Sequence, residues 1–180
     1  DTPFGPAMNF LNGKIKTNYA VYVADDDFLV PDAVEACVVF LDTHPDYVAA
    51  HGIGALIGSR SGESAAVQSA GCYRQPVVEQ DTAVGRFGSF FESYSVSLFS
   101  IHRADTWRRI FRDTPDPRVS PGCADLSFGG ELLQSALSAV YGKIGQIDKL
   151  YLIRQTHNSR YLLLSSVNWF HWVTKQDWRD

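Results

Sequence analysis

The chain has 180 residues, of which 45% are apolar and 20% charged, so its composition is that of an ordinary globular protein with a sizeable core. The net charge of −4 argues against a general nucleic-acid surface, which needs a basic face. No apolar run is long enough to span a membrane. The three cysteines, Cys37, Cys72 and Cys123, are too widely spaced for a metal-type pairing, so we expect a reducing, cytoplasmic compartment.

An apolar run from Tyr19 to Ala24 leads directly into three aspartates, Asp25, Asp26 and Asp27. The run is short, rich in β-forming residues and without alternation, which predicts a strand buried on both faces, as in a parallel sheet. Ligands of open α/β sheets bind outside the carboxyl ends of the strands, and clustered carboxylates suit Mg²⁺, Mn²⁺ or Ca²⁺. A solvated turn that leads into a helix is the alternative interpretation of the same three residues.

A helix is predicted to begin at Pro31, which suits the first helical position, and to end at His44, which precedes a proline. Its apolar face has the spacing i, i+3, i+4, i+7, with the residues Val34, Cys37, Val38 and Leu41. A short strand over Tyr47–Ala50 follows.

The middle of the chain has a weaker pattern. Residues Gly52 to Gly88 are rich in Gly, Ser, Arg and Gln, so we expect an irregular binding loop there. Glu92 to His102 alternates like a strand, and Asp105 is placed to cap a short helix. Asp113 to Gly122 carries three prolines and is predicted to be a loop.

A second clear unit begins near Glu131. The apolar residues between Leu133 and Val140 have the spacing of one helix face, so they predict a helix, which ends at Gly142. Lys149 to Arg154 is predicted to be a strand. The tail, VNWFHWVTKQDW, is predicted to be an amphipathic helix that docks on the core. Alternating strands and helices of this kind indicate an α/β fold.

The run from Asn9 through Pro31, ending in VYVADDDFLVP, resembles the central signature of GT-A-fold glycosyltransferases of the large family-2-like group, and FLDTHPDYVAAHG is also similar to that group. The resemblance implies an open, mostly parallel, Rossmann-like sheet with flanking helices. It also implies that residues 1–180 form one glycosyltransferase-like domain that lacks the first strand and helix of the group. Those elements hold much of the nucleotide base.

The resemblance places roles on the aspartates by their distance from Pro31. Asp26 takes the place of the metal-binding aspartate, and Asp25 lies where a residue near the ribose and diphosphate is expected. Ala24 stands where the group has its first aspartate, so Asp27 is a further candidate for the metal and the donor.

The same resemblance makes Glu131 the general base, since it lies eleven residues before Gly142. A base near the acceptor is needed because a sugar hydroxyl is a poor nucleophile. Gly130 replaces the first acid of the group's acidic pair, and Asp125 is a rival for the catalytic carboxylate. Without the resemblance, Glu131 is explained as a first-turn glutamate favoured by the helix dipole.

His157 matches a histidine that completes the metal site in the group, although a surface histidine is the alternative. Arg154 and Arg160 suit phosphate oxygens, but we expect them to be solvated surface charges.

The implied function is a metal-dependent, inverting glycosyltransferase that uses Mn²⁺ or Mg²⁺. Its partners would be a nucleotide-diphospho-sugar donor and a saccharide or other hydroxyl acceptor. The alternative is a non-catalytic module that binds a saccharide or a protein partner with a decayed glycosyltransferase fold. A third hypothesis is a structural Ca²⁺ site, although the aspartates do not have the spacing of an EF-hand loop.

Overall fold

The computed structural model describes residues 4–58, 67, 69–114 and 131–156. Its elements follow in this order: α1 (Phe4–Asn12), β1 (Tyr19–Ala20), β2 (Asp27–Leu29), α2 (Pro31–Thr43), β3 (Tyr47–Gly58), β4 (Ser69–Tyr73), α3 (Ala83–Glu92), β5 (Ile101–Arg103), α4 (Ala104–Asp113), α5 (Leu133–Tyr141) and β6 (Lys143–Thr156). None of the helices in these ranges is long and apolar enough to cross a bilayer.

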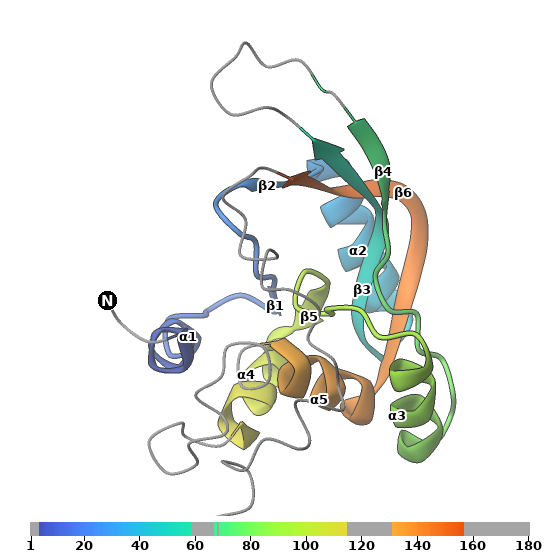
Figure 1. Cartoon of the computed structure of the whole chain (residues 1–180). Coiled ribbons are helices and arrows are strands. Elements are labelled where there is room, and N and C mark those ends of the chain that lie inside the picture. The colour runs from blue at the N-terminus through green and yellow to red at the C-terminus, as the bar shows by residue number, and fades with distance from the viewer. Residues whose placement is uncertain (1–3, 59–66, 68, 115–130, 157–180) are drawn as a thin grey trace, which may run out of the picture.

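The strands form one six-stranded sheet in the order β1-β5-β3-β6-β2, and β4 pairs with β3 outside this path. The long strands β3 and β6 run parallel to each other and curve together through the molecule (Figure 1). The other described pairings are antiparallel. The α/β class is therefore correct, but the expected mostly parallel sheet is wrong, because strand direction depends on pairing between distant segments.

Helices cover both faces of the sheet, as two successive residues of β3 show. Ala50 packs in one core cluster with Cys37 and Leu41 of α2. Ala49 packs in a second cluster with Phe90 of α3 and Ala136 of α5. Because successive strand residues point to opposite faces, α2 lies on one face and α3 with α5 on the other.

Helix α2 forms as its sequence predicts. Pro31 occupies the first turn, Cys37 and Leu41 are buried, and the helix ends at His44. Arg103 donates hydrogen bonds to the carbonyls at the end of this helix. Its Nη2 lies 2.6 Å from the Leu41 carbonyl oxygen and 3.2 Å from that of His44. A cation at this helix end also opposes the negative end of the helix dipole.

The predicted strand from Tyr19 to Ala24 is wrong in length and position. Only Tyr19–Ala20 is a strand, and it pairs antiparallel with β5 at one end of the sheet order. Val21 and Tyr22 continue as irregular, half-buried chain packed against the α2 cluster. An apolar run of this length indicates burial, but burial alone does not determine a strand.

The segment from Gly52 to Gly88, predicted to be a loop, contains most of β3, all of β4 and the start of α3. The glycines that suggested a loop are required by close strand neighbours. A Cβ on Gly52 would lie 2.3 Å from the Lys149 carbonyl oxygen, and one on Gly54 would lie 2.5 Å from that of Tyr73. Residues 59–66, which include SRSGESA, lie outside the described ranges.

Two further expectations need correction. Glu92 to His102 is not one strand, since α3 runs through Glu92 and β5 begins at Ile101. Helix α4 begins at Ala104 without a side-chain cap, and Asp105 accepts a bond from Arg108 instead.

Helix α5 ends before Gly142, as predicted, and Arg86 of α3 holds that end. The Arg86 Nε donates to the carbonyl of Ala139 at 2.8 Å, and Nη2 donates to that of Val140 at 2.9 Å. Its Nη1 donates to the carbonyls of Gln80 and Asp81 at 3.0 and 2.9 Å. One buried arginine therefore joins α3, the chain before it and α5.

We expect Arg86→Met to lower the free energy of unfolding by about 3 kcal/mol, because it removes several charge-assisted bonds and leaves buried carbonyls without donors. Chemical denaturation measures the change. Arg112→Met is the matched control, since Arg112 is 71% exposed, and it should cost less than about 0.5 kcal/mol. Equal costs in the two variants would contradict the role of Arg86.

Candidate active site

The three aspartates have different surroundings. Asp25 and Asp26 form a turn, which the Asp27 amide closes by donating to the Ala24 carbonyl at 3.1 Å. Asp25 is exposed, Asp26 is half-buried and Asp27 is buried as the first residue of β2. The triplet therefore presents Asp25 and Asp26 at a turn and sends Asp27 into the protein.

Asp27 is paired with Arg154. The two residues lie opposite each other in the antiparallel pairing of β2 with β6. The Arg154 Nε donates to Asp27 Oδ2 at 2.7 Å, and the two side chains are 14% and 0% exposed, respectively. The expectation that Arg154 is a solvated surface charge is wrong, because the register of β2 and β6 places it against a carboxylate.

Two aromatic rings hold the Arg154 guanidinium from other sides. Its carbon lies 4.1 Å from the centre of the Phe99 ring and 4.7 Å from that of Tyr73. Ring faces attract cations, and the attraction is stronger where water is excluded. The Arg154 guanidinium is therefore held in one orientation by residues of β2, of β4 and of the chain that leads to β5.

Glu131 comes from another part of the chain, directly before α5, yet it lies in the same electrostatic environment. Desolvation by the surrounding chain raises the pKa of Glu131 and the charge of Arg154 lowers it, although the residue as a whole is exposed. A carboxyl group with a raised pKa is a candidate acid or base when it lies in a functional site.

The pKa of Tyr22 is affected by several of the predicted residues. Burial raises the pKa of Tyr22, and the charges of Glu131 and Asp25 raise it further. Arg154 lowers the same pKa and Asp26 raises it. Asp25, Asp26, Glu131 and Arg154 come from three separate segments, and the charge of each affects the pKa of this one tyrosine.

Asp125, His157 and Arg160 lie outside the described residues. Within the ranges that the structure describes, no group of three or more His, Cys, Asp or Glu side chains is arranged to hold a metal ion. Asp25 and Asp26 nevertheless fit a cation of the Mg²⁺ type, which one or two carboxylates hold together with substrate phosphates.

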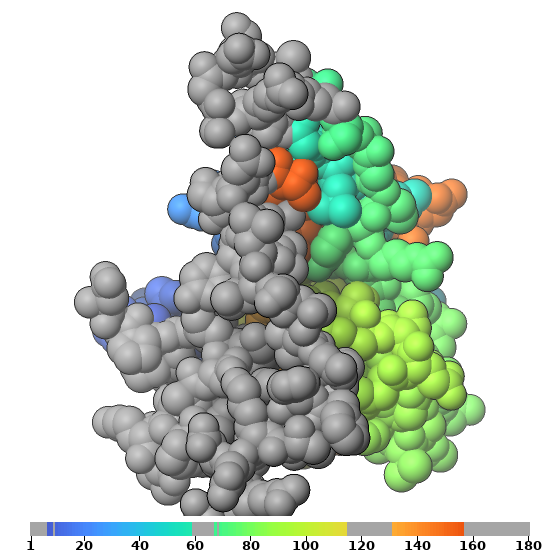
Figure 2. All heavy atoms as spheres, viewed as in Figure 1, coloured from blue at the N-terminus to red at the C-terminus, as the bar shows by residue number. Residues whose placement is uncertain are grey.

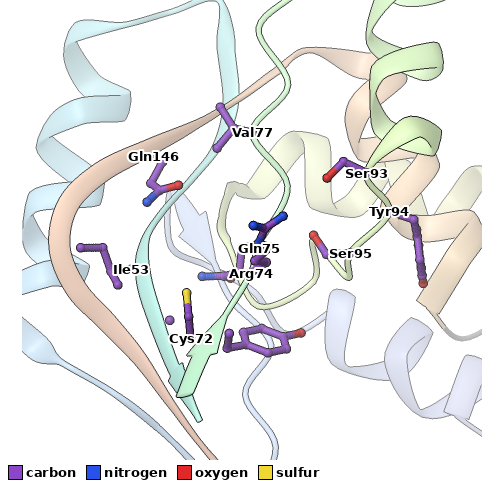
Figure 3. Close-up of a pocket in the computed structure, with 11 residues that line it drawn as sticks. Ile53, Cys72, Arg74, Gln75, Val77, Ser93, Tyr94, Ser95 and Gln146 are labelled. Carbon is purple, nitrogen blue, oxygen red and sulfur yellow. The ribbon is translucent and has the colours of Figure 1, made fainter. Parts of the chain in front are cut away.

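A cavity of about 320 Å³ lies beside this cluster, between the β3–β4 hairpin and the chain that follows α3. Figure 2 shows the green surface of the β4 region next to the yellow-green surface of the α3 region on one face of the molecule. Figure 3 shows residues from both regions around the cavity, with Arg74 and Gln75 between Cys72 and Ser95.

The cavity shares two walls with the charged cluster. Tyr73 and Tyr94 line it, and burial raises the pKa of Tyr94, with the Glu131 charge as the next cause. Tyr73 also contacts Arg154. Sequence reasoning missed this cavity because its walls lie in the segment that was predicted to be a loop, and no motif marks Tyr73 or Tyr94.

No protein-family model matches the chain, and a search of curated proteins found no significant match. The structure is similar to the crystal structure of TarS from S. aureus, with 13% sequence identity and a TM-score of 0.46. The likeness covers 84% of this chain and 24% of TarS, so the chain spans about a quarter of that protein's length. A likeness of this size assigns neither a family nor an activity to the chain.

We expect Asp27→Asn to lower the free energy of unfolding by about 3 kcal/mol, because it leaves the guanidinium of Arg154 largely buried without a countercharge. Asp105→Asn is the matched control. Asp105 also meets an arginine at 2.8 Å, but its side chain is 99% exposed, so the change should cost less than about 1 kcal/mol. Similar losses in urea unfolding of the two variants would contradict a special role for the buried pair.

Proposed function

We propose that the chain transfers a sugar from a nucleotide-diphospho-sugar to a hydroxyl acceptor. The observation that carries this proposal is the turn of Asp25 and Asp26 directly before β2, whose first residue, Asp27, holds the buried Arg154 at 2.7 Å. Carboxylates at such a turn suit a metal-bound diphosphate, and Glu131 adds a carboxyl group of raised pKa that suits base catalysis. The resemblance of VYVADDDFLVP to the family-2-like group supports the same reaction.

Glu131 is the proposed general base. It would accept the proton of the acceptor hydroxyl while the hydroxyl oxygen bonds to C1 and the bond from C1 to the diphosphate breaks. A single displacement of this kind inverts the configuration at C1. Burial raises the pKa of Glu131, and the charge of Arg154 partly offsets that rise in favour of the ionised form that a base requires.

Asp25 and Asp26 form the proposed donor side. Asp26 would be the main anchor of a divalent cation, with Asp25 near the ribose and diphosphate, and His157 stays a candidate ligand. When bound, Mn²⁺ or Mg²⁺ would neutralise the charge that develops on the leaving diphosphate. Asp27 is the weaker candidate for the metal, because its Oδ2 already accepts from Arg154.

A non-catalytic saccharide- or partner-binding module is the second candidate function. Ala24 and Gly130 stand where the resembling group has acids, which favours a decayed catalytic centre. The two functions differ in whether nucleotide and metal bind together, which the next experiment measures.

The first test is a thermal-shift panel of nucleoside diphosphates, each with and without Mn²⁺. A ligand that binds the folded state raises the melting temperature by mass action, so we expect a rise of a few degrees when metal and one diphosphate are both present. Asp26→Asn should abolish this rise and the transfer of sugar while the fold persists.

Asp32→Asn is the control for that panel, since Asp32 is an exposed aspartate in the first turn of α2. It should keep the full rise. If no combination of metal and diphosphate stabilises the unmodified chain, the proposed transferase is wrong and the binding module is favoured.

A second test concerns Glu131. Glu131→Gln should reduce transfer by about 10²- to 10⁴-fold while the thermal shift with nucleotide and Mn²⁺ is kept. Because burial raises the pKa of Glu131, kcat/KM should fall on acidification at a pH above the usual glutamate value of about 4.3.

The direction follows from the role of a base, which is lost when the carboxylate is protonated. Glu35→Gln, an exposed change on α2, serves as the control and should alter neither the rate nor the profile. A transfer rate that Glu131→Gln leaves unchanged would exclude Glu131 as the base and favour Asp125.

A further inference from the structure

The cavity beside β4 has the chemistry of a site for a ligand rich in hydrogen-bond acceptors. Its described lining includes Arg74, Gln75 and Gln146 together with Ser93 and Ser95, and none of the described lining residues is acidic. In a chain of net charge −4, a cavity with a guanidinium and no carboxylate favours an anionic ligand.

Gln75 gives the cavity an unsatisfied buried polar group. The residue is 8% exposed, and its Nε2 donates to the Gly52 carbonyl only at 3.4 Å. Its Oε1 is buried and accepts no hydrogen bond from the described residues. A buried amide oxygen without a donor is destabilising, so a rotation of the Gln75 amide that lets Oε1 accept from a ligand hydroxyl in the cavity would remove that cost.

Arg74 supplies the positive charge. It is exposed at the cavity, and no ion pair within the described ranges involves it. A guanidinium presents a planar set of donors that matches a carboxylate or a phosphate.

The two tyrosines give the cavity rigid walls. Tyr94 packs edge-on against Phe90, with ring centres 5.4 Å apart, and Tyr73 packs against Phe99 at 6.1 Å and against Arg154. Aromatic rings offer an apolar face beside a polar hydroxyl, which suits the mixed surface of a sugar ring. The volume of about 320 Å³ lies at the lower end of ligand pockets, so it suits one sugar unit.

We propose that this cavity binds a sugar unit that carries an anionic group, either a carboxylate or a phosphate. Arg74 contacts the anion, Gln75 accepts a bond from a sugar hydroxyl, and Tyr73 and Tyr94 enclose the ring. Because Tyr73 lines the cavity and its ring also lies 4.7 Å from the guanidinium carbon of Arg154 in the charged cluster, we assign the bound sugar as the acceptor of the proposed reaction. This last assignment rests on the proposed glycosyl transfer, whereas the binding itself does not.

Calorimetric titration with glucose 6-phosphate, glucuronate, glucose and inorganic phosphate tests the proposal on the full chain. We expect at least one of the anionic sugars to bind more than tenfold more tightly than glucose and inorganic phosphate. The tighter of glucose 6-phosphate and glucuronate identifies the anionic group. Equal binding of glucose, or no binding of any of these compounds, would overturn the proposal.

Variants assign the contacts. Arg74→Gln should weaken binding of the anionic sugar about tenfold and leave glucose unchanged, whereas the matched Arg112→Gln should change neither. Gln75→Leu should weaken every sugar. Because Gln75 is buried, Gln75→Glu is tested beside it; it keeps the shape, adds negative charge and should weaken the anionic sugars most. Unaltered affinity in Arg74→Gln would overturn the assignment of the anion to this cavity.

These titrations contain no metal and no nucleotide. Their failure would therefore leave the nucleotide-dependent thermal shift intact, and loss of that shift would leave sugar binding intact. The two proposals are thus tested separately.

Discussion

The ion pair between Arg154 and Asp27 is the interaction on which the candidate site depends. Strand β2 has only three residues, Asp27–Leu29, and lies at one end of the sheet order, so its own ladder gives it little stability. The pair ties its first residue to β6 across 127 positions of sequence. The turn that carries Asp25 and Asp26 is thereby placed relative to the rest of the sheet.

This arrangement also explains how three successive aspartates are tolerated. Neighbouring carboxylates repel each other unless solvent or positive charge compensates them. Asp25 is exposed to solvent, while Asp27 is compensated by a guanidinium that two aromatic rings hold in place. The middle residue, Asp26, lies between these environments, which suits the role of main ligand proposed for it.

Tyr73 connects the charged cluster with the cavity beside β4. It ends a strand that pairs with β3 outside the main order of the sheet, and the pairing requires a glycine opposite it at position 54. A side chain at Gly54 would meet the Tyr73 carbonyl, so the hairpin could not close in this register. The Tyr73 ring also contacts the Arg154 guanidinium. In the proposed reaction, Arg154 would lie on the donor side of this contact, and the cavity that Tyr73 lines would lie on the acceptor side.

The local features of the chain follow from short-range sequence patterns. Helix α2 could be predicted with both ends, because Pro31 and His44-Pro45 act on the backbone within a few residues, and the end of α5 at Gly142 is local in the same way. The aspartate triplet could be singled out by residue type and by its place after an apolar run, whereas Glu131 was singled out only by the resemblance to the family-2-like group. Three features could not be predicted in this way: the direction of the strands, the folding of a glycine-rich segment into β3 and β4, and the pairing of Arg154 with Asp27. These depend on contacts between segments far apart in the chain, where periodicity and composition carry no information about which residues meet.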